Sequence, residues 1–161
     1  MLEASRPATA DDLPRIVQLA ELMREELVAM KGGALWSARE AHADPAAAYA
    51  DLVPRDDALV LVGTIDDAVV GFGVVRLERL HTGAALGVIT DLFVEPGARE
   101  VGVGEELVGG LVAFCAAHNC VGIDALALPG HRATKNFFEG FGFTARALVM
   151  HHRLTEGEAG G

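Results

Sequence analysis

The sequence predicts an α/β fold, in which a mixed, mostly antiparallel sheet is flanked by helices on both faces. Three observations predict it. Apolar runs of strand length alternate with segments of helical period along the 161 residues, a length that suits one domain. Two runs, residues 59–63 and 69–77, flank a turn at Asp66-Asp67 and predict an antiparallel hairpin. Strand, helix and strand then follow within residues 88–128, which predicts a parallel pair with a right-handed crossover.

The N-terminal third is predicted to hold one strand and two helices. A short strand spans residues 3–8, and Thr9 and Asp12 then have the spacing of a capping box. Apolar residues recurring every three or four positions predict a helix over residues 11–30, which a glycine pair ends. Asp44-Pro45 begins a shorter helix, predicted over residues 46–52.

The central part is predicted to form the hairpin and a buried strand–helix pair. Gly71 and Gly73 weaken the second hairpin strand and indicate a bulge or a close backbone approach. An apolar strand over residues 88–94 follows, and Pro96-Gly97 then forces a turn. After Gly104, apolar residues four positions apart predict a helix with a broad buried stripe.

The C-terminal part is predicted to complete a domain over residues 1–154. A buried strand is expected over 121–128 and a last helix over 131–140. A closing strand is expected over 144–154, where the sequence is rich in apolar residues but alternates poorly. Residues 155–161 form a polar, glycine-bearing tail that we expect to be disordered.

Composition narrows the class of protein. The formal net charge of −10 argues against non-specific nucleic-acid binding, which needs clustered Lys and Arg, and it suits either a cationic substrate or simple solubility. No run of about 18 apolar residues is free of charge, so no membrane span is expected. The only cysteines, Cys115 and Cys120, match no disulfide or zinc spacing, and with no signal-peptide pattern they favour a cytoplasmic protein. No metal site is expected, because His151 and His152 are neighbours that would point to opposite faces of a strand.

The stretch from Val88 to Gly104 carries the clearest functional pattern. An apolar strand runs into Arg99-x-x-Gly102-x-Gly104, where a helix begins, and such a turn aims backbone N–H groups at an anion such as phosphate. A dinucleotide fingerprint would need a third glycine where Leu107 stands, and no Gly-Lys-Ser/Thr triplet marks a Walker A loop.

The remaining pattern resembles motif A of the GNAT acetyltransferase superfamily, in which such a turn holds the pyrophosphate of acetyl-CoA. About 40 residues later, residues 133–143 (A-T-K-N-F-F-E-G-F-G-F) look like motif B of the same superfamily. Both motifs lie on the expected elements in the expected order, and the resemblance covers nearly the whole chain.

The resemblance implies acetyl-CoA as co-substrate, held by the strand end, the glycine turn and the motif B helix. The residues implied are Phe93, Val94, Arg99, Glu100, Val101, Gly102, Val103, Gly104, Glu105, His131, Lys135 and Phe138. Two positions depart from the family pattern. The asparagine of motif B is His131 here, and its tyrosine, often the general acid that protonates the leaving thiolate, is Phe138.

Amine acetylation requires a neutral nitrogen, and a free primary alkylamine has a pKa near about 10, so a base helps. Asp91 is the candidate, because many relatives carry an acidic residue at this place on the strand; the alternative is a carboxylate that bonds nearby backbone groups. Thr90, next to it, cannot act as a base at neutral pH. Glu26, Trp36 and Tyr49 are candidate substrate contacts, although the two aromatic residues are equally typical of packing anchors.

The expected function is direct transfer of an acetyl group from acetyl-CoA to an amine, without a covalent enzyme intermediate. The expected partner is a small-molecule or peptide amine, with no nucleic acid and no membrane, and a homodimer is compatible with this interpretation. Two alternatives stay open: a catalytically weak acyl-CoA-binding or regulatory module, to which Thr90 and Phe138 point, and a domain for a different phosphate ligand.

Overall fold

The computed structural model of the protein describes residues 1–129 and 131–155. These residues form two compact units. The first unit consists of Met1–Met23 and His42–Leu126, and the second of Arg24–Ala41 and the described residues from Ala127 onward. Within the described residues, no helix is both long and apolar enough to cross a membrane.

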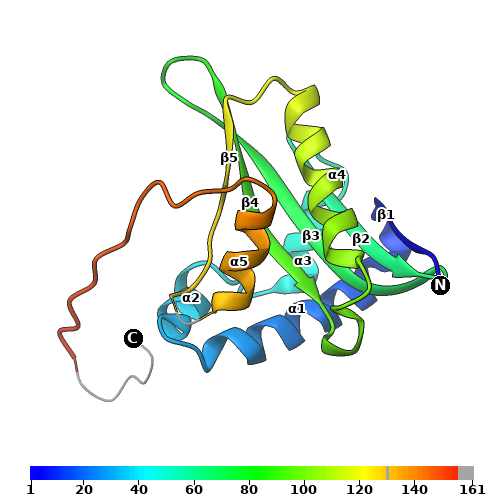
Figure 1. Ribbon diagram of the computed structural model, residues 1–161, viewed down its shortest axis with the longest axis horizontal. Coiled ribbons are helices and arrows are strands. Elements are labelled where there is room, and N and C mark those ends of the chain that lie inside the picture. Colours follow the sequence, from blue (N-terminus) through cyan, green and yellow to red (C-terminus); the bar gives the residue numbers. More distant parts are fainter. Residues whose placement is uncertain (130, 156–161) are drawn as a thin grey trace. The chain divides into compact units, whose positions relative to one another are not determined.

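The first unit is built on a five-stranded sheet whose spatial order follows the chain (Figure 1). The first four strands pair antiparallel and the last pair is parallel, so the predicted fold class is confirmed. The strands are β1 Glu3–Pro7, β2 Ala58–Ile65, β3 Ala68–Arg79, β4 Ala85–Val94 and β5 Gly122–Ala125. The turn between β2 and β3 has positive φ at both Asp66 (47°) and Asp67 (71°), as a two-residue hairpin of matching twist requires.

Helix α4, Val103–Ala117, covers one face of this sheet, and glycines let it approach closely (Figure 1). A Cβ atom added at Gly63 would lie 2.5 Å from Val103 Cγ1, and one at Gly73 would lie 3.1 Å from Leu111 Cδ1. A Cβ at Gly71 would lie 2.8 Å from the Phe93 carbonyl oxygen. The close approach predicted at Gly71 and Gly73 is therefore present. A bulge also lies beside Gly71, because Gly63 pairs with Gly71 and Thr64 with Val69, which leaves Val70 without a partner in β2. A second bulge lies in β4, opposite Val74 and Val75.

The opposite face of the sheet is covered by α3, Pro45–Leu52, whose Tyr49 packs edge-on against Phe72 of β3. Asp44 caps α3 as predicted, with Oδ1 accepting from Ala47 N at 3.2 Å. Helix α1, Leu13–Val28, begins in the first unit, where Arg15 donates to the Val69 carbonyl and forms an ion pair with Glu95.

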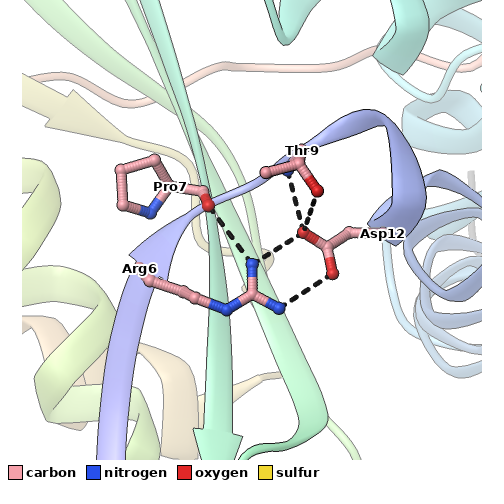
Figure 2. Close-up of polar contacts among 4 residues, drawn as sticks. All are labelled: Arg6, Pro7, Thr9 and Asp12. Atoms are coloured by element: carbon pink, nitrogen blue, oxygen red, sulfur yellow. Dashed lines mark hydrogen bonds and ion pairs between the residues drawn. The ribbon is translucent and has the colours of Figure 1, made fainter.

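The joint between β1 and the short 3₁₀ helix η1, Ala10–Asp12, is closed by an aspartate (Figure 2). Asp12 accepts two hydrogen bonds from the Arg6 guanidinium, at 2.8 and 2.9 Å, and one from the Thr9 backbone N–H at 2.8 Å. The Arg6 hydrogen bond, followed by that of Thr9, lowers the pKa of Asp12 to about 2, against the opposing effect of burial. The predicted capping box is present, and its carboxylate is paired with a cation.

The second unit contains the end of α1, the helix α2, Gly33–Arg39, and the helix α5, Arg132–Gly140. Helix α2 follows Gly32, which has a φ of 81°, and Arg24 Nε donates to Ser37 Oγ at 2.7 Å. The sequence interpretation ended a helix at this glycine pair but missed the second helix that begins there. Four phenylalanines at the end of α5 and just after it are linked by ring contacts: Phe137 contacts Phe138 and Phe141, and Phe138 contacts Phe143.

The predicted closing strand is wrong, because residues 144–154 form no strand. Leu148, Val149, Met150 and Leu154 are each at least 80% exposed. Apolar composition favours burial but does not supply a pairing partner, and the weak alternation of this segment gives it no single face to bury. The predicted single domain over residues 1–154 stays a prediction, and the tail beyond residue 155 lies outside the described residues.

Candidate active site

Strand β4 carries one residue more than its partner strand needs. Val75 pairs with Ile89 and Val74 pairs with Asp91, so Thr90 has no partner in the β3 ladder and forms a bulge. The parallel pairing of β4 with β5 ends one step earlier, at Ile89 and Ala125. From Thr90 onward, no described strand pairs with β4 on the β5 side. The bulge therefore stands where the two parallel strands part.

Asp91 is buried in the first unit, with 6% of its surface exposed, and both carboxylate oxygens accept a hydrogen bond from a hydroxyl group. Tyr49 Oη donates to Oδ2 at 2.5 Å, and Thr90 Oγ1 donates to Oδ1 at 2.6 Å. In residues 1–129 and 131–155, no cation forms an ion pair with this carboxylate. Hydroxyl donors can satisfy the oxygens, but they leave the negative charge uncompensated.

Tyr49 is itself fixed by aromatic neighbours and is only 1% exposed. Its ring makes edge contacts with His42, at 5.1 Å between centroids, and with Phe72, at 5.6 Å. Burial, and then the charge of Asp91, raise the pKa of Tyr49 far above its usual value, so it stays a hydrogen-bond donor. The structure thus brings the predicted residues Tyr49 and Asp91 together, with Tyr49 supporting the carboxylate.

The glycine turn leads from β4 into α4 as the sequence predicts. A short 3₁₀ helix, η2 (Pro96–Ala98), follows β4, and Gly102 then caps α4 with a φ of 92°, where a side chain would be strained. Glu106 N is bonded to the Gly102 carbonyl at 3.2 Å. The N–H groups of Val103, Gly104 and Glu105 precede this first helical bond, so they remain available to an anion in front of the helix.

Arg99 is tied to the end of β4. Its Nε donates to the Val94 carbonyl at 2.7 Å, and its guanidinium lies 5.2 Å from the centre of the Phe93 ring. It therefore brings positive charge to the turn. Glu100, Glu105 and Glu106 bring negative charge there, which stabilises the helix start but competes with a bound phosphate. Val101 lies in the same turn, between Glu100 and the helix cap.

The other predicted cofactor contacts lie on α5 in the second unit. His131 caps this helix, and its Nδ1 is 2.7 Å from Thr134 Oγ1. Lys135 forms an ion pair with Glu139 at 3.3 Å, and both side chains are mostly exposed. Phe138 is 6% exposed, and its ring lies 5.1 Å from that of Phe143 in a tilted arrangement, so it packs as a buried residue.

Two predicted substrate contacts, Glu26 and Trp36, also belong to the second unit. Glu26 is half-buried near the end of α1, and Trp36 of α2 is 7% exposed. Trp36 precedes Ser37, which accepts from Arg24 through both its hydroxyl and its carbonyl oxygen. The burial of Trp36 favours a packing role, and the parts of Glu26 and Trp36 in binding a substrate stay predictions.

Sequence reasoning missed two residues that complete the Asp91 cluster. Thr90 was set aside because a hydroxyl is not a base, although its place at the strand end indicated a site residue. His42 lies in a segment without periodicity, and nothing in the sequence linked it to Tyr49 seven residues later.

Comparison with known proteins gives a family match. The model of the acetyltransferase (GNAT) family matches residues 18–143. No curated protein matches the chain.

Solved structures share the fold. A tetramutant of a protein from Bacillus halodurans has a TM-score of 0.80 at 22% identity, covering 96% of this chain and 100% of that one. An aminoglycoside acetyltransferase from an uncultured soil metagenomic sample, in complex with sisomicin, has a TM-score of 0.69 at 18% identity, covering 95% of each chain. AAC(6')-Iy in complex with the bisubstrate analogue CoA-S-monomethyl-acetylneamine has a TM-score of 0.69 at 16% identity, covering 96% and 99%.

Proposed function

Because the chain belongs to the acetyltransferase (GNAT) family, we propose that it transfers an acetyl group from acetyl-CoA directly to an amine of a small molecule or peptide. The observation that carries this proposal is the turn before α4. A glycine with positive φ caps the helix there, and three N–H groups precede the first helical hydrogen bond. A helix start with these features suits the pyrophosphate of CoA.

Acetyl-CoA fits the residues of the first unit. Its pyrophosphate would accept hydrogen bonds from the N–H groups of Val103, Gly104 and Glu105, with Arg99 supplying positive charge beside them. Its pantetheine arm would bond the backbone of Phe93 and Val94, on the β4 edge that no described strand covers. His131, Lys135 and Phe138 are proposed as further contacts from α5.

The proposed reaction needs no covalent enzyme intermediate. The neutral amine attacks the acetyl carbonyl carbon, a carbon–nitrogen bond forms, and the carbon–sulfur bond breaks to release CoA thiolate. A primary alkylamine with a pKa near about 10 is mostly protonated at neutral pH, so a negative charge near the nitrogen is useful before and during attack. Asp91 supplies that charge in this proposal.

Two structural relatives favour a small-molecule amine as acceptor. One was solved with sisomicin and the other with an analogue that joins CoA to acetylneamine. The net charge of −10 on this chain would favour a cationic amine through long-range attraction. We place the reaction in the cytoplasm, where acetyl-CoA is available.

The test is release of CoA thiol from acetyl-CoA in the presence of sisomicin, spermidine or a short peptide with a free amino terminus. We expect amine-dependent release with at least one of the three, and calorimetric binding of CoA but not of NAD or ATP. Gly104→Val should weaken CoA binding by about 10-fold or more, because a branched side chain would hold the phosphates off the backbone. Gly109→Val is the matched control, since a Cβ there meets no atom within 4 Å. Equal CoA affinity in the two folded variants would contradict the proposed site.

The alternative, a catalytically weak acyl-CoA-binding module, is favoured by one observation. Phe138 is a buried phenyl group at the position where the family pattern has an acid. The cysteine thiol, an analogue of the CoA thiol, has a pKa of about 8.5, so a thiolate can leave without an acid, and catalysis without one is slower rather than abolished. Faster single-turnover acetylation by Phe138→Tyr would show an enzyme that lacks its acid. CoA binding without amine-dependent thiol release in wild type would favour the module.

A further inference from the structure

Among the three hydrogen-bonded residues Tyr49, Asp91 and Thr90, only Thr90 is exposed to solvent. Tyr49 and Asp91 are 1% and 6% exposed, whereas Thr90 is exposed. It is also the surplus residue of the β4 bulge, one step beyond the last β4–β5 pair. A substrate approaching this part of β4 would meet the threonine hydroxyl before the carboxylate.

The hydrogen bond to Asp91 determines what this hydroxyl offers to a ligand. A carboxylate can only accept, so the single hydroxyl proton of Thr90 is donated to Asp91 Oδ1, 2.6 Å away. The lone pairs of Thr90 Oγ1 remain, and they can only accept a hydrogen bond. Thr90 therefore presents an acceptor, strengthened by the charge behind it.

The second oxygen of Asp91 makes this arrangement stable. Tyr49 donates to Oδ2 at 2.5 Å and is enclosed by Phe72 and His42. Because Tyr49 holds Oδ2 in place, the carboxylate cannot easily turn Oδ1 away from Thr90. The result is a chain of three side chains, from the buried tyrosine through the aspartate to the exposed threonine.

We propose that Thr90 Oγ1 accepts an N–H of the substrate amine and passes its proton to Asp91. This inference rests on the proposed acetyl transfer and assigns the amine-binding atom within it. Thr90 is then a catalytic residue, and Asp91 and Tyr49 are positioning residues that act through it.

The step balances. As the neutral amine nitrogen bonds the acetyl carbon and the carbon–sulfur bond breaks, its proton moves to Thr90 Oγ1. The original Thr90 hydroxyl proton moves to Asp91 Oδ1 at the same time, so threonine ends as it began. CoA leaves as thiolate, and the proton on Asp91 returns through Thr90 to the thiolate or to water. The buried carboxylate thus acts on an amine that it does not touch.

The experiment compares Thr90→Val, which removes the hydroxyl at nearly constant shape, with Thr90→Ser, which keeps it. Thr64→Val is a control for the loss of a threonine hydroxyl elsewhere in the sheet, since Thr64 is a buried strand residue beside the other bulge. Each variant is assayed with sisomicin, spermidine and the peptide as acceptors, and CoA affinity is measured by calorimetry. We expect Thr90→Val to lower kcat by about 100-fold with CoA affinity unchanged. Thr90→Ser should keep most of the wild-type kcat, and Thr64→Val should have the kcat of wild type.

Three outcomes would overturn the assignment. Wild-type turnover in Thr90→Val would show that the hydroxyl takes no part. Equal losses in Thr90→Ser and Thr90→Val would show that keeping the hydroxyl does not preserve turnover, so the loss would not report on the hydroxyl. Loss of CoA affinity in parallel with kcat would show a distorted strand. Failure of the proposed function itself looks different, because wild type would then acetylate none of the three amines.

Discussion

Two buried aspartates in the first unit, Asp12 and Asp91, are held in opposite ways. They are almost equally buried, at 8% and 6% exposure. Asp12 accepts two hydrogen bonds from the Arg6 guanidinium and one from the Thr9 backbone N–H. Asp91, within the part of the chain that the structure describes, accepts only from the hydroxyls of Tyr49 and Thr90. The first carboxylate is paired with a cation and closes a local joint. The second has no ion pair with a cation among residues 1–129 and 131–155.

The difference separates a structural carboxylate from one suited to chemistry. Arg6 is 46% exposed, so solvent screens its ion pair with Asp12, and the pair contributes modestly to the stability of the fold. A charge held by hydroxyls alone can still attract a proton, because its donors can also relay one. We therefore expect mutations at Asp91 to change turnover, and mutations at Asp12 to change stability.

The largest effect is expected from the matched substitutions Asp91→Asn and Asp12→Asn, assayed for amine-dependent thiol release per folded molecule. An amide at position 91 cannot take a proton, and its NH₂ group turns one hydroxyl partner around. We expect Asp91→Asn to lower kcat by about 100-fold or more, the usual contribution of a general base. Asp12→Asn should leave kcat unchanged. Similar kcat values in both variants would contradict the claim that Asp91 acts in catalysis whereas Asp12 acts only in stability.

A smaller effect is expected from Tyr49→Phe, which removes one donor from the buried carboxylate. The free energy of unfolding should fall by about 1–3 kcal/mol, the cost of an unsatisfied buried polar group. The pH dependence gives a second measurement. The pKa of Tyr49 is raised in the folded state. The contribution of Tyr49 to the free energy of unfolding is therefore complete below about pH 10, where the unfolded tyrosine begins to ionise, and it is lost as the pH rises further. Tyr49→Phe should show a shallower alkaline loss than wild type in denaturant titrations; an identical slope would contradict the buried, protonated tyrosine.

The smallest effect is expected at Asp12, on stability alone. Its folded-state pKa of about 2 lies below that of an unfolded aspartate near about 3.9. The contribution of the Asp12 carboxylate to the free energy of unfolding is therefore present above about pH 4 and is lost as the pH falls toward 2. We expect Asp12→Asn to lower the unfolding free energy by about 1 kcal/mol at neutral pH, because Arg6 is 46% exposed and solvent screens the pair. Equal stability of variant and wild type at pH 2.5, with a difference at pH 7, would confirm the assignment; a constant difference would not.

Most of the fold of the first unit could be predicted from sequence, because its signals are local. The hairpin turn at Asp66-Asp67, the Asp44-Pro45 helix start and the glycine turn before α4 each depend on neighbouring residues. The closing strand over 144–154 was wrong for the opposite reason. A strand needs a partner elsewhere in the chain, and composition does not supply one.

The candidate site was predictable only where it follows a motif. The backbone groups from Arg99 to Glu105 were predicted from the glycine spacing, since a strand, a turn and a helix start define their geometry. The Tyr49–Asp91 hydrogen bond joins residues 42 positions apart. The role of Thr90 depends on a bulge that shifts the ladder by one residue, and alternation along a single strand cannot reveal such a shift.

That extra residue in β4 places stability and activity in opposition. Val74 and Val75 are consecutive in β3, but their partners Asp91 and Ile89 are two apart, so a chain lacking Thr90 would form a regular ladder with both partners on their present faces. Selection for a more stable sheet alone would tend to delete it. A designer who removed this residue to idealise the strand would therefore obtain a more stable sheet with the same core. The same change would remove the hydroxyl through which, in our proposal, the buried carboxylate acts on the substrate.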